Sequence, residues 1–514
     1  MQLRVDVFGI GDVPQLLEGE ELEEVHRAFQ EQVKNIEENP SRFENSEELK
    51  VGFEVEYTLL DSDNNQASEQ VRDRIKDKQE FLDSELAASV IEARTDPVSE
   101  PDSLREFGKE LRDREHRAAE VAAEEGFDLL RYGTNPFPDL DEFERSGDED
   151  SRYEMFANFL DEARNDEMVH DVFGIEESFD PRDIHYSGMI ASTQTNLQAQ
   201  SLGDAVEKAN FGYMFAPFAE ALGANARVME QKDTGISDIR MPVWEKSADV
   251  REDEDFGSES PRAGKIDSYI GKEDGHDIED YFERLDPVYV APDVEEAPDA
   301  IDQAVMNNWK DINIKFTDDA ALVELRPFSI QPTVQEDLAL SAFMMGRIAY
   351  AQDEKVHGSG GEDLLDIEKV NRNRYTAMHN GLDEKLYDSS GNQRQAVEVV
   401  QDELEYARQG LNSLGVDYEN FVPGDQDLFD YTFGERLEEG IAPGDQSAER
   451  YNELRENMSD EQALAEVMKD YKVSNRAHDN PKELFDESHS STENGDEEYD
   501  TSQFTGDGGF VGPS

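Results

Sequence analysis

The sequence predicts an α+β protein in which a curved antiparallel β-sheet has one polar face and helices pack against the other. Two patterns predict this class. Four separate segments place charged or amide side chains at alternate positions, as strands with one polar face do. Several longer segments have apolar residues at helical spacing. Hydrophobic residues are 36% of the chain, which is enough for a sizeable core.

The N-terminal part, residues 1–48, is expected to hold a strand and a helix. Residues 3–8 alternate as a short strand does, and residues 18–39 have an apolar stripe opposite acidic residues. An amphipathic helix of this kind is more often structural than functional.

The clearest strand is V-G-F-E-V-E-Y-T-L-L-D at residues 51–61. Glu54 and Glu56 share its polar face. Two residues of strand rise are about 6–7 Å, so both carboxylates could contact one cation. In a chain this acidic, an ordinary solvated face is the alternative. The opposite face suits packing against helices and holds Val51, Phe53, Val55, Tyr57 and Leu59.

A second strand follows a polar connection at residues 61–78. The stretch E-L-A-A-S-V-I-E-A-R-T contains Glu85, and then Glu92 and Arg94 on one face of the predicted strand. Ser103, with a Glu three residues later, begins a helix as a capping box does, and Gly126 suits its C-terminal end. Residues 127–132 predict a further strand.

Residues 185–198 predict a strand with an uncharged polar face. Gln194 and Asn196 lie on that face between Ser192 and Gln198. Neutral hydrogen-bonding side chains in a row suit the wall of a ligand site.

A loop at residues 231–240 follows a predicted buried helix at residues 205–226. It contains Thr234, Gly235 and Arg240, a composition that could hold phosphate, although a single glycine-containing loop is a weak signal.

Residues 312–316 and 322–330 predict a β-hairpin, with Glu324 and Arg326 on the same face. Helices are predicted from Thr333 onward. We expect residues 1–473 to form one catalytic domain, with an acidic insertion at 252–300 and a helical region at 334–473. Residues 474–514 contain few apolar residues and predict a disordered acidic tail.

The charge of the chain limits its surroundings and partners. Its 514 residues include 123 Asp and Glu against 48 Lys and Arg, a net charge of -75 spread along the whole length. Such repulsion is tolerable in concentrated salt, which indicates a cytoplasmic protein of a high-salt cell interior. The charge argues against nucleic acid, which needs clustered Lys and Arg. No signal peptide or membrane span is predicted, and no cysteine is available as a nucleophile or zinc ligand.

Together, the four polar strand faces suggest a single site. Each face alone is more often a solvated surface. Several carboxylates and two arginines on one half-enclosed face would be costly to hold without a ligand that balances them. Divalent cations such as Mg²⁺ and a polyphosphate supply that balance.

An ordered set of motifs adds a family resemblance across residues 51–414. The chain resembles the type 2 glutamate–cysteine ligases, which include the plant and proteobacterial enzymes. The resemblance implies a glutamine-synthetase-like fold, related to the guanido kinases, in which the antiparallel sheet forms a funnel with helices outside. Its motifs are G-F-E-V-E-Y, E-L-A-A-S-V-I-E-A-R-T, G-T-N-P, S-T-Q-T-N-L, A-L-G-A-N-A, T-G-I-S-D-I-R-M-P-V-W, V-E-L-R-P-F-S-I-Q-P-T and V-N-R-N-R-Y-T-A-M-H-N-G-L-D.

The resemblance also implies the chemistry. ATP phosphorylates a substrate carboxylate, and an amine attacks the acyl phosphate to form an amide, which for this family is γ-glutamylcysteine. Two or three Mg²⁺ ions are implied, with ligands Glu54, Glu56, Glu85, Glu92 and Glu324.

The same resemblance assigns roles around the nucleotide and the substrates. Gln194 is expected near the nucleotide and metal, with Thr234 and Gly235 also on the nucleotide. Arg326 is expected to clamp the γ-phosphate. Arg240 would contact substrate or phosphate, and Asn196 would line the substrate pocket.

Three departures from the family pattern affect the substrate assignment. The family usually has Ser-Pro where this chain has Ala226-Arg227, Arg where Lys315 stands, and Asp soon after the E-x-R motif, where Phe328 and Ser329 follow here. Another amine acceptor is therefore an alternative, as is a non-catalytic binding protein. Phosphoryl transfer to a guanidino group is disfavoured by the lack of cysteine. The partners expected are small molecules, and the sequence leaves the oligomeric state open.

Overall fold

The structure is a computed structural model that describes residues 20–44, 50–99, 103–138, 146, 185–247, 263–271, 278–285, 300–306, 308–357, 364–419 and 427–475. The predicted strand at 3–8, most of the acidic insertion at 252–300 and residues 476–514 lie outside these ranges. The division of the chain into the predicted domain and tail therefore stays a prediction.

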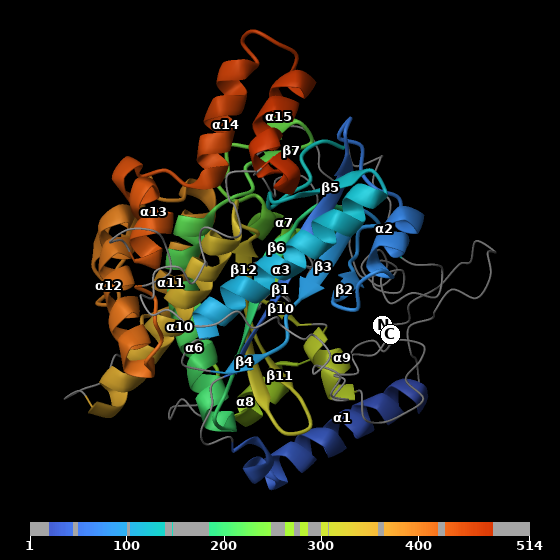
Figure 1. The fold of residues 1–514 in the computed structure, drawn as a ribbon. Coiled ribbons are helices and arrows are strands. Elements are labelled where there is room, and N and C mark those ends of the chain that lie inside the picture. The colour runs from blue at the N-terminus through green and yellow to red at the C-terminus, as the bar shows by residue number, and fades with distance from the viewer. Residues whose placement is uncertain are drawn as a thin grey trace, which may run out of the picture.

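Within the described residues, an open antiparallel sheet forms the centre of the molecule (Figure 1). Its strand order is β11-β12-β6-β1-β3-β2, and β4 and β5 also pair with β1. The mixture of helices with an antiparallel sheet confirms the predicted α+β class, whereas the funnel shape stays a prediction. The strands are β1 (Lys50–Asp61), β2 (Leu82–Ser84), β3 (Val90–Arg94), β4 (Val98–Ser99), β5 (Phe127–Leu130), β6 (Ser192–Gln198), β11 (Ile312–Phe316) and β12 (Ala321–Ser329).

Strand β1 organises the sheet because both of its edges are paired. One edge pairs with β6 and then with β5, and the other pairs with β4 and then with β3. Its predicted apolar face is buried, with Val55 and Leu59 completely inaccessible. The alternation read from the sequence therefore distinguishes the core side of the sheet from its polar side.

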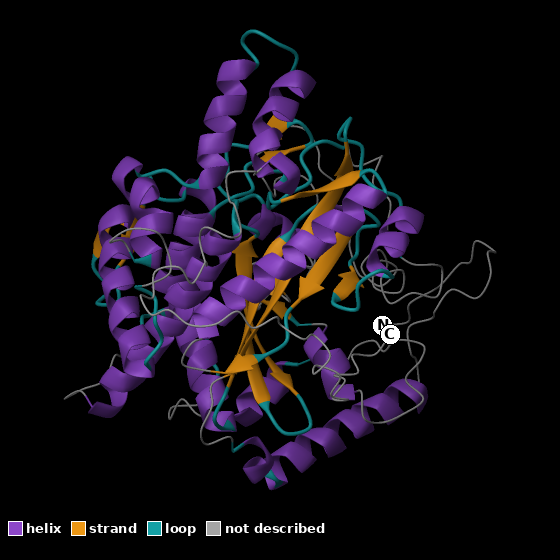
Figure 2. Cartoon of the chain, viewed as in Figure 1, coloured by secondary structure: helices purple, strands orange, loops and turns teal. Residues whose placement is uncertain are grey.

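Helices cover the apolar side of the sheet (Figure 2). Phe53 of β1 meets Phe107 of α3 edge to face at a centroid distance of 5.1 Å. Helices α6 and α10 pack behind β12, β11 and β6. The helices are α1 (Glu20–Glu38), α2 (Glu69–Lys76), α3 (Ser103–Glu124), α5 (His185–Gly188), α6 (Leu202–Gly223), α7 (Arg240–Ser247), α8 (Ile278–Arg284), α9 (Ala300–Met306), α10 (Val334–His357), α11 (Ile367–Asn380), α12 (Ala396–Leu414), α13 (Leu428–Glu439), α14 (Pro443–Leu454) and α15 (Asp460–Met468).

Short elements complete the described fold. They are the strand pairs β7 (Val228–Met229) with β8 (Lys232–Asp233), β9 (Ala263–Gly264) with β10 (Trp309–Lys310) and β13 (Lys385–Tyr387) with β14 (Gln393–Gln395), and the 3-10 helices η1 (Pro40–Phe43), η5 (Lys469–Tyr471) and η6 (Val473–Asn475).

A buried ion pair joins the core side of the sheet to the helices. The Arg131 guanidinium donates to the Asp337 carboxylate of α10 at 2.7 Å, and the Thr193 hydroxyl of β6 donates to the same carboxylate at 2.6 Å. All three side chains are at most 1% exposed. Because breaking such a pair would leave a buried charge, the network holds the backbone of β6 in place for the residues on its other face.

One predicted boundary was wrong. The strand expected at 185–198 begins only at Ser192, because His185–Gly188 forms α5 and Met189 and Ala191 bond to the chain after β5 instead. Asn135 N–H donates to the Met189 carbonyl at 2.7 Å, and Ala191 N–H donates to the Gly133 carbonyl at 3.0 Å. The connection expected at 61–78 contains α2.

In the described part of the chain, none of the helices combines the length and apolar character that crossing a bilayer requires.

Candidate active site

The pairing register brings the four predicted polar strand faces together on one side of the sheet. Residues opposite each other in an antiparallel pair point to the same side. Glu56 pairs with Glu92, Glu54 pairs with Gln194, and Asn196 pairs with Glu324. Side chains from β3, β1, β6 and β12 therefore form a continuous polar face, as the sequence predicts.

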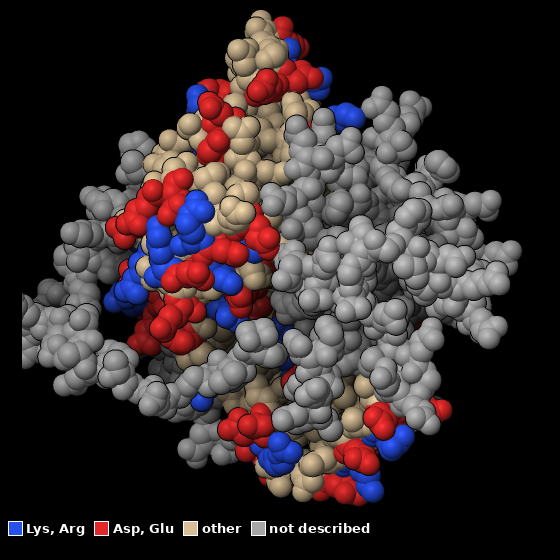
Figure 3. Space-filling view, turned by 90° about the vertical axis from the view of Figure 1, so that its right-hand side faces the viewer, with Lys and Arg blue, Asp and Glu red and all other residues tan. Residues whose placement is uncertain are grey.

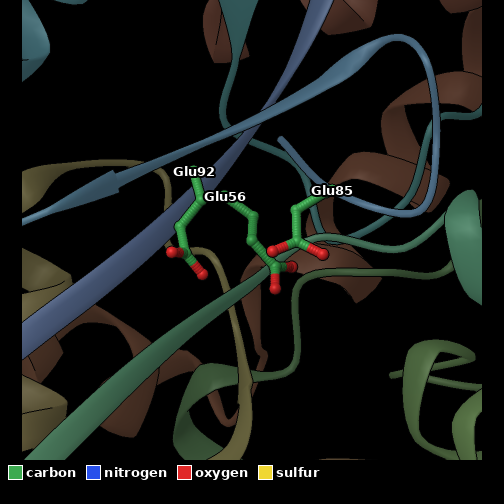
Figure 4. A group of neighbouring side chains, drawn as sticks. All are labelled: Glu56, Glu85 and Glu92. Carbon is green, nitrogen blue, oxygen red and sulfur yellow. The ribbon is translucent and has the colours of Figure 1, made fainter. Parts of the chain in front are cut away.

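Three carboxylates at one end of this face are close enough to share a cation. One oxygen from each of Glu56, Glu85 and Glu92 lies within 4.8 Å of the others. Glu56 comes from β1, Glu92 from β3 and Glu85 from the connection between β2 and β3, and Figure 4 shows their carboxylates pointing into one region. Carboxylate oxygens are the ligands that Mg²⁺ prefers, so the donor set fits that ion.

Burial and mutual repulsion make this carboxylate group costly without a cation. Glu92 is only 7% exposed. Burial raises the pKa of Glu92 well above its ordinary value, and Glu54, Glu85 and Glu56 raise it further. Burial likewise raises the pKa of Glu56, although Arg240 and a hydrogen bond from Ser192 oppose the shift. A divalent cation would relieve this repulsion.

Glu54 and Glu324, also predicted as metal ligands, both contact Lys315, and their role toward a metal stays a prediction. Lys315 of β11 makes a close ion pair with Glu324, and its Nζ lies 3.9 Å from a Glu54 oxygen. Arg326 Nη1 lies 3.5 Å from the other Glu324 oxygen. Burial alone would raise the pKa of Glu324, but Lys315 and Arg326 outweigh it and hold the pKa below its ordinary value.

Amide and backbone donors orient the carboxylates. Gln194 Nε2 donates to Glu56 at 3.2 Å, and Asn196 Nδ2 donates to Glu54 at 3.1 Å. The Ser192 N–H donates to the second oxygen of Glu56 at 2.6 Å. The predicted amide row thus lies beside the carboxylates.

Several buried polar atoms around this face have no hydrogen-bond partner among the described residues. They are Ser192 Oγ, Asn196 Oδ1, Arg240 Nε and Glu324 Oε2. Buried polar atoms are normally satisfied, so unused donors and acceptors gathered in one place suit a polar ligand.

The two predicted arginines lie together beside the sheet. Arg240 begins α7 and is 5% exposed, and its Nη2 donates to the Arg326 carbonyl at 3.1 Å. The Arg326 guanidinium lies 5.3 Å from the ring centroid of Trp244, also on α7. Helix α7 therefore positions both guanidinium groups.

Pro327 explains why β12 presents Arg326 at an irregular position. Proline has no N–H for the ladder, and the register shifts between Leu325 and Phe328. The Arg326 N–H donates instead to the Asp311 carbonyl at 2.9 Å. The Asp311 carboxylate is in turn held by Arg374 of α11, with Nη2 to Oδ1 at 3.2 Å.

Thr234 and Gly235 form hydrogen bonds to residues that shortly precede them in the chain. The Thr234 hydroxyl donates to the Arg227 carbonyl at 2.7 Å, and the Gly235 N–H donates to Asp233 at 2.9 Å. Arg227 pairs with Asp233 and with Asp445 of α14, each at 2.8 Å. Their role toward a nucleotide stays a prediction, and Arg227 is a structural partner that sequence reasoning noted only as a departure.

Lys315 and Arg374 are the other site-proximal residues that sequence reasoning did not assign. A lysine alternating with isoleucines on a predicted strand was a signal for Lys315. Arg374 lies in the motif N-R-N-R-Y, but nothing local distinguishes it from Arg372 as the buried arginine.

Solved structures show similarity in fold at low sequence identity. A bifunctional glutathione synthetase from Pasteurella multocida matches with a TM-score of 0.50 and 14% identity, over 86% of this chain and 54% of that one. The chain thus spans about half the length of that protein. A glutamate–cysteine ligase from Francisella tularensis in complex with AMP matches with a TM-score of 0.47 and 10% identity, over 85% of this chain and 90% of that one. No curated protein sequence gives a significant match.

The family assignment comes from the sequence profile of glutamate–cysteine ligase family 2 (GCS2), which matches residues 50–466. That range includes every strand and arginine of the candidate site. Since the match covers most of the chain, the protein belongs to glutamate–cysteine ligase family 2.

Proposed function

We propose that this protein is an ATP-dependent carboxylate–amine ligase that forms γ-glutamylcysteine from glutamate and cysteine. The observation that carries the proposal is one polar sheet face bearing four carboxylates, with Glu85, Arg240 and Arg326 beside it. Family membership supports the ligase class.

Each group of residues on this face suits one part of the reaction. Glu56, Glu85 and Glu92 would hold Mg²⁺, which when bound neutralises and orients the ATP phosphates. Arg326 and Arg240 would stabilise the charge on the transferring phosphoryl group. Gln194 and Asn196 would keep the carboxylates oriented while the substrates are bound.

In the proposed reaction, the γ-phosphoryl group passes from ATP to a carboxylate oxygen of glutamate, and ADP leaves. The neutral amine of the acceptor then attacks the acyl carbon. The carbon–oxygen bond to phosphate breaks, the amide forms, and the nitrogen loses a proton.

Another amine acceptor is the second candidate within this class. Arg227 stands where the family usually has proline, and its guanidinium is engaged by Asp233 and Asp445. At this position the present chain therefore has a charged side chain held by two carboxylates, where the family pattern has an uncharged proline. This departure from the family pattern is the reason to test amines other than cysteine.

The acidic surface supports the proposal of a salt-rich working environment. Figure 3 shows acidic side chains spread over the described surface of one side, with basic ones among them. The net charge of -75 makes molar salt the appropriate assay condition.

The test is ADP release from ATP and Mg²⁺ in molar KCl, with glutamate and a panel of amines. Release that requires both glutamate and cysteine supports the substrate pair. Release with a different amine keeps the ligase chemistry and replaces the acceptor. No release with any acceptor from a folded protein would favour a non-catalytic binding role.

A further inference from the structure

The polar face of the sheet is divided into two parts with different charge balance. At one part, one oxygen from each of Glu56, Glu85 and Glu92 lies within 4.8 Å of the others, and Arg94 Nε lies 3.7 Å from Glu92. That arginine is shared with Asp83 at 2.8 Å. At the other part, Glu54 and Glu324 have Lys315 between them and Arg326 beside them.

The two parts differ in the direction of their pKa shifts. Burial and neighbouring carboxylates raise the pKa of Glu92, whereas Lys315 and Arg326 hold the pKa of Glu324 below its ordinary value. Both carboxyl groups are buried, at 7% and 1% exposure. Burial is therefore common to both carboxyl groups, and the opposite directions of their pKa shifts follow from the charged groups near each one.

Lys315 reaches its partners across the sheet. It belongs to β11, and β12 and β6 separate that strand from β1, which carries Glu54. The ammonium nevertheless contacts carboxylates of both β12 and β1. Asn196 of the intervening β6 donates to the same oxygen of Glu54 that Lys315 approaches. The Lys315 ammonium group thus lies between carboxylate oxygens of Glu54 and Glu324.

A divalent cation between Glu54 and Glu324 would compete directly with this ammonium. Both would use Glu324 Oε1 and Glu54 Oε1, and two cations sharing these oxygens would repel each other. A divalent cation that displaces Lys315 must break an existing ion pair, so it gains less binding free energy there. A cation at Glu56, Glu85 and Glu92 instead relieves repulsion between carboxylates.

We propose that Lys315 is a built-in counter-ion that takes the place of a divalent cation between Glu54 and Glu324. In the nucleotide-free protein, the polar face then binds a divalent cation at Glu56, Glu85 and Glu92 and not at Glu54 and Glu324. This inference concerns cation binding by the free protein and does not depend on the proposed ligase activity.

The test is a titration of the nucleotide-free protein with Mn²⁺, in which electron paramagnetic resonance measures the free ion. Molar KCl suppresses weak binding to the acidic surface. The wild type is expected to bind one Mn²⁺ tightly, and Glu92→Gln is expected to weaken that binding about 10-fold or more. Lys315→Met is expected to bind one additional Mn²⁺, which the double variant Lys315→Met/Glu324→Gln loses again.

Lys369→Met is the matched control, because it removes one positive charge from a lysine of α11 that bonds to the Gly391 carbonyl. It should bind Mn²⁺ as the wild type does. No added Mn²⁺ in folded Lys315→Met would overturn the proposal.

Glu324→Gln alone provides a second test if Lys315→Met does not fold. The proposal expects this variant to keep the Mn²⁺ stoichiometry and affinity of the wild type. A lost equivalent of Mn²⁺ in Glu324→Gln would show that Glu324 already binds the metal, and the proposal would be wrong.

Discussion

Lys315 Nζ lies 3.9 Å from a carboxylate oxygen of Glu54, although two strands separate β11 from β1. The contact joins an edge strand of the sheet to its central strand through side chains on the polar face. Together with Glu324, these residues make the candidate site a continuous charged surface that spans β11, β12, β6, β1 and β3.

Glu324→Gln and Arg326→Ala are each expected to reduce turnover by about 100-fold or more, because Arg326 would stabilise the transferring phosphoryl group and Glu324 is its ion-pair partner. ADP release in molar KCl measures the effect, and circular dichroism verifies the fold. Arg394→Ala is the control. Arg394 lies on β14, outside the central sheet, and makes an ion pair with Asp402 of α12. Normal activity in either site variant would remove the proposed site.

Glu92→Gln is expected to stabilise the metal-free protein while weakening its response to Mg²⁺. The substitution removes one of three crowded, buried carboxylates, so repulsion falls when no cation is present. Thermal unfolding in EDTA and in Mg²⁺ checks both effects. The metal assignment fails if Mg²⁺ raises the melting temperature of the variant and the wild type equally.

Asp238 is expected to make stability depend on pH in an unusual direction. Burial raises its pKa from 3.8 to about 6, against hydrogen bonds from Ser329 and the Arg240 N–H. Between these values the folded state binds more protons than the unfolded chain. The stability contribution is therefore fully present below about pH 4 and falls as the pH rises through 6, by roughly 3 kcal/mol.

Urea unfolding of the wild type and Asp238→Asn at pH values from about 4 to 7 measures this contribution, because the titration of all other groups is common to both proteins. The free energy of unfolding of the wild type, relative to the variant, should decrease across this range. A constant difference, or an increase, would contradict the assignment.

Removing residues 476–514 is expected to change activity and thermal stability little, as their composition predicts no packed core. A cut after Lys472 should cost more, because the Ser474 N–H donates to Asp128 at 3.1 Å in the described structure. Comparing melting temperatures of the two truncations tests this boundary. A large fall in melting temperature or activity on removal of residues 476–514 alone would assign the tail a structural role.

The strands that carry the site were predictable because alternation is a local property. Glu54, Glu92 and Glu324 each stand within a segment whose apolar residues mark the opposite face, and the structure confirms those faces. The start of α3 at Ser103 was also predictable. A left-handed Gly126, with φ of 88°, follows the end of that helix as expected.

The charge balance of the site was not predictable because it depends on strand order. The contact between Lys315 and Glu54 exists only because β12 and β6 bring β11 near β1. The link between Arg227 and Asp445 likewise joins distant segments through tertiary packing. Pro327 within a predicted central strand was a local signal of the irregularity beside Arg326.

The measurement that tests the central claim most directly is isotope transfer during turnover. Glutamate labelled with ¹⁸O in its side-chain carboxylate would be converted with cysteine, ATP and Mg²⁺ in molar KCl, and the released phosphate would be analysed by mass spectrometry. An acyl-phosphate route predicts one labelled oxygen in each phosphate, because the carboxylate oxygen leaves with the phosphoryl group. Amide product accompanied by unlabelled phosphate would contradict this account of the site.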